Sequence, residues 1–143
     1  MARTGTLVKG IVFDMYGTLV DVGAALPQLK EEYLLAVLSN GTPRMLRTGL
    51  ERTRLKPHFR RVISADSVKL YKPSPKVYQL ALERTGLRKD EILFVSSNSF
   101  DVLGAGSFGF NVCWINRTGA PLDTLGAKPD LVVKNFDELI ETL

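Results

Sequence analysis

Polar side chains follow several apolar runs of this sequence, at the points where the runs end. Asp14 closes the run "GIVF" and is followed by Tyr16 and Thr18, while Ser39 and Asn40 close the run "LLAVL". Later positions of the same kind hold a lysine, a second acid and small hydroxyl or amide groups: Lys72, Ser96, Ser97, Asn98 and Asp101. A carboxylate with a compensating ammonium group nearby can act as a nucleophile, and neutral donors can orient it. The pattern predicts a reactive site centred on Asp14.

Each of these residues also has a purely structural explanation. Asp14 could cap the turn that follows it, and Asn98 or Ser99 could cap the next helix, since such residues are common at caps and turns. Lys72 could be an ordinary exposed lysine. These explanations are adequate singly, but together they require a coincidence at four separate strand ends.

The elements that would position these residues alternate along the chain. We predict strands at the apolar runs Leu7–Phe13, Leu34–Leu38, Val62–Ser64, Ile92–Val95, Asn111–Ile115 and Leu131–Val133. Amphipathic segments predict helices at Ala24–Glu31, Pro43–Leu55, Ser74–Thr85, Phe100–Phe108 and Phe136–Leu143. Continuous apolar strands indicate burial on both faces of a parallel sheet. We therefore expect an α/β three-layer sandwich with right-handed crossovers.

Such a sheet gives the strand-end residues a common location. In open α/β folds, ligands bind outside the carboxyl ends of the strands, where the order of the strands reverses. Side chains that directly follow different strands can therefore converge there. We expect the acids, the lysine and the small polar groups to meet at one edge of the sheet.

Composition limits the class of protein. The 143 residues predict one domain spanning 1–143, with 45% hydrophobic residues to form its core. The single cysteine, Cys113, excludes an internal disulfide and a multi-cysteine metal site, and its apolar surroundings predict a core residue. No apolar stretch reaches the ~20 residues that a membrane span requires, and no signal-peptide pattern is present. We therefore expect a cytoplasmic protein that does not associate with membranes.

The net charge of +4 has two interpretations. Arg44, Arg47, Arg54 and Lys56 recur near helical spacing and could form a nucleic-acid-binding stripe. We favour a solvated helix face, because the stripe lacks interleaved aromatic residues and no nucleic-acid-binding module is recognisable. A modestly positive surface also suits a small anionic substrate.

Four motifs of the chain resemble a known family. "FDMYGTL", "VLSNG", "KPSPKVY" and "LFVSSNSFD" are similar, in order and spacing, to the four motifs of the haloacid dehalogenase superfamily. The Ser-Ser-Asn form of the last motif resembles the L-2-haloacid dehalogenase branch, and "GAKPD" at 126–130 extends the similarity. The resemblance implies a Rossmann-like parallel sheet and hydrolysis through an aspartyl-ester intermediate.

The resemblance also indicates whether the site binds a metal ion. Phosphatases of this superfamily carry a second Asp two residues after the nucleophile, to protonate an alkoxide leaving group, and this position is Tyr16 here. Where those enzymes have an acidic fourth motif that binds Mg²⁺, this sequence has Ser96 and Ser97. Only Asp14 and Asp101 remain as candidate metal ligands, so we expect no cofactor. A halide leaves without protonation, which is consistent with both losses.

The resemblance assigns roles to residues at matching positions. Asp14 would attack C2 of a 2-haloacid, and water would then hydrolyse the ester. The other catalytic residues that the resemblance implies are Lys72, Asp101, Ser96, Asn98 and Thr18. Lys72 would compensate the charge of Asp14. Asp101 would position both Lys72 and the water. The substrate-binding group is Ser39, which would bind the carboxylate, together with Asn40, Tyr16, Tyr78 and Phe100, of which Asn40 and Phe100 would cradle the halide.

One part of the family pattern is missing. The family inserts a helical cap after the first motif, and an arginine of that cap receives the halide. Here the segment 22–33, "VGAALPQLKEEY", is too short for a cap and contains no arginine. Lys30, Arg44 or a partner subunit, as in a homodimer, could replace it. Two alternatives therefore stay open beside dehalogenation: a Mg²⁺-dependent capless phosphatase, and a relative without catalytic activity.

Overall fold

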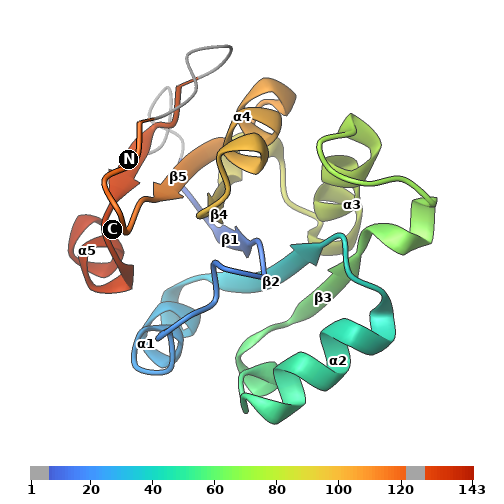
Figure 1. The fold of residues 1–143 in the computed structure, drawn as a ribbon, viewed down its shortest axis with the longest axis horizontal. Helices are drawn as coiled ribbons and strands as arrows, with labels where there is room; N and C mark the ends of the chain where they lie inside the picture. Colours follow the sequence, from blue (N-terminus) through green and yellow to red (C-terminus); the bar gives the residue numbers. More distant parts are fainter. Residues whose placement is uncertain (1–6, 122–127) are drawn as a thin grey trace.

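The computed structural model describes residues 7–121 and 128–143, so the first two positions of "GAKPD" lie outside these ranges. Within them, six parallel strands form one sheet in the order β3-β2-β1-β4-β5-β6 (Figure 1). The strands are β1 Gly10–Phe13, β2 Leu34–Ser39, β3 Arg61–Ser64, β4 Ile92–Ser96, β5 Asn111–Ile115 and β6 Leu131–Val133. The predicted α/β fold with a parallel sheet is confirmed.

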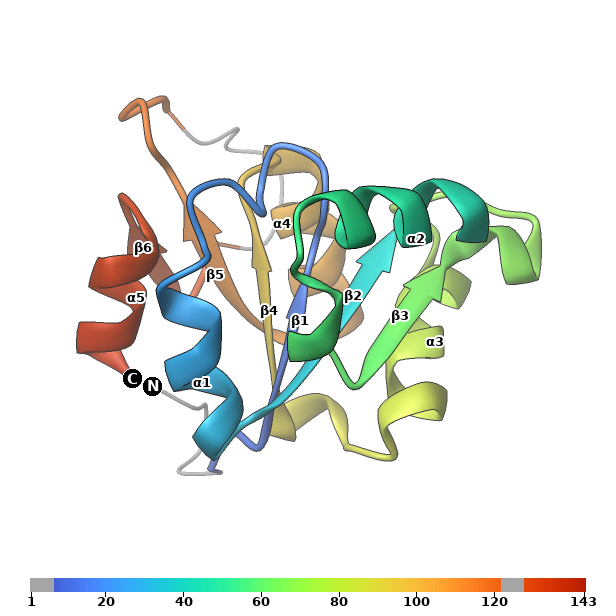
Figure 2. The same cartoon turned by 90° about the horizontal axis from the view of Figure 1, so that it is seen from below.

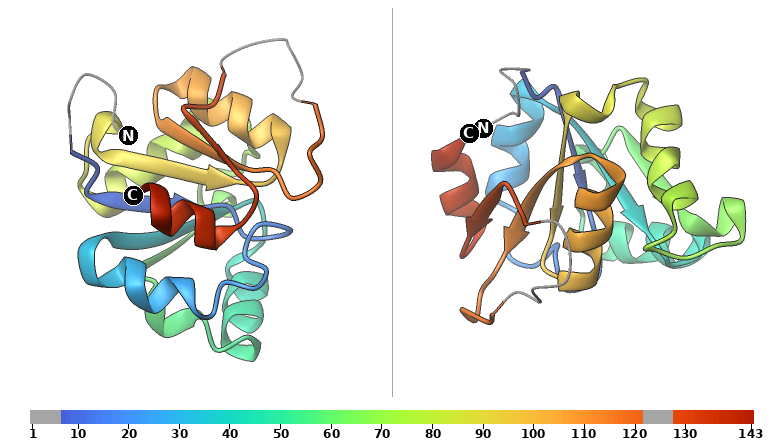
Figure 3. Two further views of the ribbon diagram at one scale, coloured as in Figure 1. Left: turned by 90° about the vertical axis from the view of Figure 1, so that its left-hand side faces the viewer. Right: turned by 90° about the horizontal axis from the view of Figure 1, so that it is seen from above.

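Helices cover both faces of this sheet. They are α1 Ala25–Glu32, α2 Pro43–Arg52, α3 Pro75–Thr85, α4 Ser99–Phe108 and α5 Phe136–Thr142, with short 3₁₀ helices at Lys56–His58, Ala65–Val68 and Lys89–Glu91. Helices α1, α2 and α5 lie on one face, in front of the sheet in Figure 2, and α3 and α4 lie on the other. Figure 3 shows the resulting three layers from two further sides.

The sheet separates two apolar clusters, and β1 contributes to both. Ile11 and Phe13 pack with Leu26 of α1 and Leu46 of α2, while Val12 packs on the opposite face with residues of α3 and α4. Because successive side chains of a strand point to opposite faces, a strand buried on both sides must be apolar at every position. This explains why the strands of this sequence are continuous apolar runs.

Helix α2 ends three residues earlier than the sequence predicted. Thr42 caps its start by accepting a hydrogen bond from the Met45 N–H, and Pro43 occupies the first turn. At the other end the Thr53 hydroxyl donates to the Gly49 carbonyl, and Arg54 adopts a left-handed conformation with φ of 60°. The helix therefore stops at Arg52, and Leu55 lies beyond it.

The segment between β1 and β2 forms part of the core rather than a lid. After a loop that follows Asp14, α1 buries Leu26 and Leu29 against the same cluster as α5. The basic residues of the α2 region, Arg44, Arg47, Arg54 and Lys56, are exposed, as expected of a solvated face. In the part of the chain that is described, none of the helices combines the length and the apolar character needed to cross a membrane.

Candidate active site

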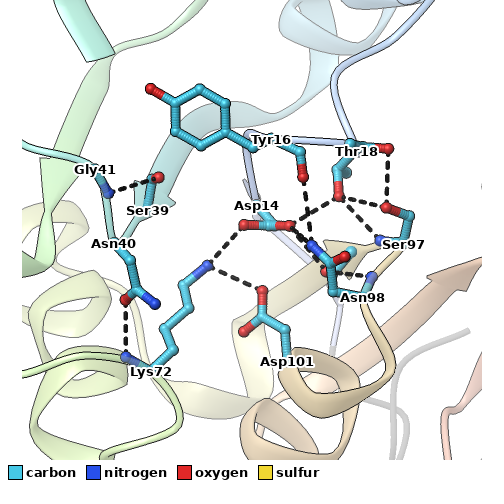
Figure 4. A network of polar contacts seen from close by, with 12 residues as sticks. Asp14, Tyr16, Thr18, Ser39, Asn40, Gly41, Lys72, Ser97, Asn98 and Asp101 are labelled. Carbon is cyan, nitrogen blue, oxygen red and sulfur yellow. Dashed lines mark hydrogen bonds and ion pairs between the residues drawn. The ribbon is translucent and has the colours of Figure 1, made fainter. Parts of the chain in front are cut away.

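The strand-end residues converge on Asp14, as Figure 4 shows. The two oxygens of its carboxylate have different surroundings. Oδ2 accepts hydrogen bonds from Thr18 Oγ1 at 3.0 Å, Ser96 Oγ at 3.2 Å and Asn98 Nδ2 at 2.6 Å, whereas Oδ1 accepts one bond, from Lys72 Nζ at 3.0 Å. These donors come from the ends of β1 and β4 and from the segment before α3. Asp14 is therefore fixed in orientation by three parts of the chain.

Lys72 links the two buried acids of the site. Its Nζ lies 3.0 Å from Asp14 Oδ1 and 2.9 Å from Asp101 Oδ2, and its side chain is only 1% exposed. Burial raises the pKa of Asp101, and the Lys72 ammonium opposes that effect. A single ammonium group therefore balances two carboxylates, of which Asp101 is fully buried and Asp14 is 10% exposed at the side chain.

Tyr78 lies behind this pair, so the substrate-binding group implied by the resemblance is corrected at this residue. The side chain is fully buried, and its hydroxyl donates to Asp101 Oδ1 at 2.6 Å. Burial, together with the Asp101 charge, raises the pKa of Tyr78, so the phenol keeps its proton and remains a donor. Tyr78 orients Asp101 and has no surface with which to touch a substrate.

Gly104 of α4 makes room for the Tyr78 hydroxyl. A Cβ at this position would lie 2.6 Å from Tyr78 Oη and 2.7 Å from Pro73 Cβ. A glycine inside a helix costs about 1 kcal/mol relative to alanine, so replacement by alanine ordinarily stabilises. Here the contact with Tyr78 reverses that expectation, because a rigid core responds to added volume with strain.

We expect Gly104→Ala to lower the free energy of unfolding by about 1–3 kcal/mol, the usual cost of overpacking. The measurement is chemical denaturation. The matched control is Gly23→Ala, because a Cβ at Gly23 would meet no atom within 4 Å. A Gly104→Ala protein as stable as wild type would show that Tyr78 can move without cost.

Ser39 and Asn40 approach the site from the end of β2. Ser39 Oγ accepts the Gly41 N–H at 3.1 Å, and Asn40 Oδ1 accepts the Lys72 N–H at 2.8 Å. Among the described residues, no acceptor takes the Ser39 hydroxyl proton or the Asn40 amide protons. Both side chains are thus held through their acceptor atoms. The Asn40 donors are partly exposed, whereas Ser39 is only 1% exposed, so an anion would have to displace its surroundings slightly to reach its hydroxyl.

Two aromatic residues that are close in the sequence to site residues are about half exposed. Tyr16 is 48% exposed and Phe100 is 49% exposed, although both are large hydrophobic residues. Figure 4 shows the Tyr16 ring above Asp14, on the side of Ser39 and Gly41. Asp14 therefore lies below an aromatic ring that is half exposed to solvent.

Sequence reasoning assigned no role to two residues that fix the loop after Asp14. Ser97 was expected at this end of the strands but was given no role, and its N–H donates to Thr18 Oγ1 at 2.9 Å and its Oγ to the Gly17 carbonyl at 2.9 Å. Arg117 donates to the same loop and was not considered at all. It lies two residues beyond β5, so the strand-end rule, applied to every strand, would have found it.

The donor set does not fit a divalent cation. Mg²⁺ binds through carboxylate or carbonyl oxygens, but Asp14 Oδ2 already accepts three hydrogen bonds, and Asp14 Oδ1 and Asp101 Oδ2 both lie against the Lys72 ammonium, which would repel a second cation. Within the described ranges, no three His, Cys, Asp or Glu side chains are grouped so that they could hold a metal ion.

One suggested substitute for the cap arginine lies in the wrong place. Lys30 is near the end of α1, where it lines a surface hollow with Leu34, Leu35 and Arg60 at the starting ends of β2 and β3. This is the edge of the sheet opposite Asp14. Arg44, in the first turn of α2, is exposed and follows Asn40 by four residues, so it lies on the same edge as the site.

Comparison with known proteins places this geometry in a family. The model of the haloacid dehalogenase-like hydrolases matches residues 20–115. The chain belongs to this family. The haloacid dehalogenase fold that the motifs suggested is thereby confirmed, and the site described above occupies the carboxyl edge of its sheet.

Individual relatives show which branch of the family this chain is similar to. The (S)-2-haloacid dehalogenase of Pseudomonas sp. (strain YL) is 42% identical over 85% of this chain and 53% of its own length. Haloacetate dehalogenase H-2 of Moraxella sp. (strain B) is 40% identical over 86% of this chain and 55% of its own. This chain thus spans about half the length of the curated relatives it matches.

A solved structure is similar as well. The crystal structure of the L-2-haloacid dehalogenase RSc1362 aligns with a TM-score of 0.90 at 25% identity, covering 96% of this chain and 99% of that one. The resemblance to the L-2-haloacid dehalogenase branch is confirmed.

Proposed function

We propose that this chain hydrolyses the carbon–halogen bond of small 2-haloacids, with Asp14 as the nucleophile. The observation that carries the proposal is the unequal solvation of the Asp14 carboxylate. Three donors surround Oδ2, whereas Oδ1 has Lys72 alone. An oxygen with a single donor keeps lone pairs for attack on carbon, and we assign the attack to Oδ1.

The first step is a displacement at C2 of the haloacid. Asp14 Oδ1 forms a bond to C2 from the side opposite the halogen, and the carbon–halogen bond breaks with both electrons leaving on the halide. The product is an ester between Asp14 and the former haloacid, with inversion at C2. A halide is a weak base, so this step requires no general acid, which is consistent with Tyr16 at the position where phosphatases have one.

The second step is hydrolysis of this ester. A water oxygen attacks Cγ of Asp14, and negative charge develops on the carbonyl oxygen, which is Oδ2. Asn98, Ser96 and Thr18 already point their donors at that atom, so they would act as an oxyanion hole. The Cγ–Oδ1 bond of the ester then breaks. One of the two water protons goes to the hydroxyacid oxygen and the other to solvent, and Asp14 is restored as a carboxylate that carries the oxygen of the water. In this step Asp101 positions Lys72.

Substrate binding follows from the donors that remain available. The Ser39 hydroxyl would donate to the substrate carboxylate, and the Asn40 amide, with the edge of Phe100, would face the halide. Tyr16 would cover the apolar part of the substrate. Of Lys30 and Arg44, only Arg44 lies at the same end of the strands as the site and could replace the cap arginine, and a second subunit of a homodimer is the other source. We propose that the protein works in the cytoplasm, because its single cysteine, Cys113, can form no internal disulfide.

The Mg²⁺-dependent phosphatase is the weaker alternative, because the Lys72 ammonium already lies against both Asp14 Oδ1 and Asp101 Oδ2 and would repel a second cation there, and because Tyr16 cannot protonate an alkoxide as an acid does. The test compares chloride release from L-2-chloropropionate with hydrolysis of an aryl phosphate in Mg²⁺. We expect slow chloride release that EDTA leaves unchanged, slow because the open mouth admits water and weakens electrostatic stabilisation. Phosphate release abolished by EDTA would support the phosphatase, and turnover of neither substrate would support a relative without catalytic activity.

A further inference from the structure

The loop after β1 carries two groups of the proposed site and passes over the surface before α1 begins. It contains Asp14 and Thr18, and its conformation includes Gly17 with φ of 77°, which L residues rarely adopt. Among residues 7–121 and 128–143, no cap domain covers the loop. Its conformation must therefore be maintained by contacts with the core, and the strongest of these come from the ends of β4 and β5.

The Arg117 guanidinium binds three backbone carbonyls of this loop. Nη1 donates to the Gly17 oxygen at 2.8 Å, and Nη2 donates to the Thr18 oxygen at 2.8 Å and the Val20 oxygen at 3.4 Å. Three carbonyl dipoles that converge on one point repel each other unless a cation lies between them. The planar fork of arginine satisfies them together, which the single nitrogen of lysine cannot do in the same geometry.

Ser97 and Trp114 complete the restraint from the other side. Ser97 donates to Gly17 and Thr18, as described, and the Trp114 indole N–H donates to the Ser97 carbonyl at 3.2 Å. Trp114 is 6% exposed and thus anchors Ser97 to the core. We call Arg117, Ser97 and Trp114 the loop bracket. Its effect reaches the nucleophile through Thr18, whose hydroxyl accepts from Ser97 and donates to Asp14 Oδ2.

We infer that Arg117 is a positioning residue that holds the loop after β1 so that Thr18 donates to the nucleophile. The kinetic part of this inference rests on the proposed dehalogenation, whereas the restraint of the loop does not. Arg117 binds backbone atoms on the outer side of the loop and does not touch Asp14. Its loss would therefore disturb the geometry of the reacting carboxylate more than the binding of substrate.

The surroundings of Arg117 permit a rescue experiment. Its side chain is exposed, and it lines a cleft of about 320 Å³ together with Ser97 and Trp114. Free guanidinium ions can therefore reach the position that the side chain would vacate in Arg117→Ala. The ion restores the hydrogen bonds to the loop carbonyls but not the covalent link to β5.

The kinetic test measures chloride release by wild type, Arg117→Ala and Arg117→Lys. We expect kcat to fall roughly 10–100-fold in Arg117→Ala, the effect of a displacement of about 1 Å at a reacting group, with KM little changed. Millimolar guanidinium should restore part of kcat. The control is Arg61→Ala. Arg61 is also exposed and donates to two backbone carbonyls, those of Arg84 and Arg60, but it lies at the start of β3, at the end of the strands opposite Asp14. An increase in KM alone, or an equal loss in Arg61→Ala, would overturn the inference.

A second measurement is independent of turnover. Hydrogen exchange of the amides of residues 17–20 should be faster in Arg117→Ala, and slower again with guanidinium. The emission of Trp114, the single tryptophan of the chain, should shift as its bond to Ser97 loosens. Unchanged exchange and emission would overturn the inference. Suppose that hydrogen exchange is faster in Arg117→Ala but that neither wild type nor any variant releases halide. This result would support the restraint of the loop by Arg117 and would reject the proposed function. Arg117→Lys keeps the charge and provides the same measurements if Arg117→Ala is too unstable to purify.

Discussion

Replacement of Asp14 by asparagine is expected to abolish halide release, with a loss on the order of 10⁴-fold or more, as for the removal of other enzymic nucleophiles. The amide oxygen and nitrogen of asparagine can occupy the positions of Oδ1 and Oδ2, but neither is an anionic nucleophile. The substitution also places a neutral group beside the Lys72 ammonium. The measurement is chloride release from L-2-chloropropionate under saturating conditions.

A control and a trapping experiment make this result specific. Asp66→Asn is the matched control, because Asp66 pairs with an exposed lysine, Lys69, at 3.1 Å on the surface, and this variant should keep full activity. Wild-type protein quenched with acid during turnover should contain a peptide with Asp14 bearing the propionate unit of the substrate. Halide release that persists in Asp14→Asn, or a label on another residue, would reject Asp14 as the nucleophile.

The parallel sheet and the edge that carries the site could be predicted from the sequence because both follow from local patterns. Continuous apolar runs indicate strands buried on both faces, and the residue after each run lies at the carboxyl edge. Asp14 and Asn98 were found in this way. Ser39 and Ser96 proved to be the last residues of their strands, which still places them at the same edge.

The path of the chain to some contacts could not be predicted. Lys72 was expected beside Asp14, but it follows β3 by eight residues, and no pattern showed that the 3₁₀ helix Ala65–Val68 and the turn after it would bring it there. The division of donors between the two Asp14 oxygens depends on side-chain rotamers, which no spacing encodes. The three 3₁₀ helices were missed because segments so short have no apolar period.

Replacement of Lys72 by methionine is expected to destabilise the protein by about 3–5 kcal/mol at neutral pH and to abolish activity. Methionine fills a similar volume, so the loss comes from charge rather than from a cavity. Without the ammonium group, Asp14 and Asp101 face each other as buried carboxylates, and removing one partner of a buried ion pair carries a cost of this size. The measurement is denaturant unfolding at several pH values.

The pH dependence identifies the cause. Burial raises the pKa of Asp101 in the folded protein above its pKa in the unfolded chain, which is ordinarily about 3.9. At a pH between these two pKa values, the folded state therefore binds more protons than the unfolded state. In that window the free energy of unfolding falls as pH rises. Lys72 lowers the pKa of Asp101, so its removal raises that pKa further and extends the window upward. The difference in stability between wild type and Lys72→Met should therefore be smallest near pH 4 and grow toward neutral pH.

A surface lysine provides the comparison for this variant. Lys56 lies 3.4 Å from Glu51, and both side chains are about half exposed. Lys56→Met should cost at most about 1 kcal/mol, because water and salt screen an exposed pair, and its effect should vary little between pH 5 and 7. If Lys72→Met loses the same stability at pH 4 as at pH 7, the methionine is failing to pack, and the ammonium group does not balance two ionised acids in the folded protein. A loss that grows with pH instead attributes the stability of this site to the charge that the proposed reaction also needs.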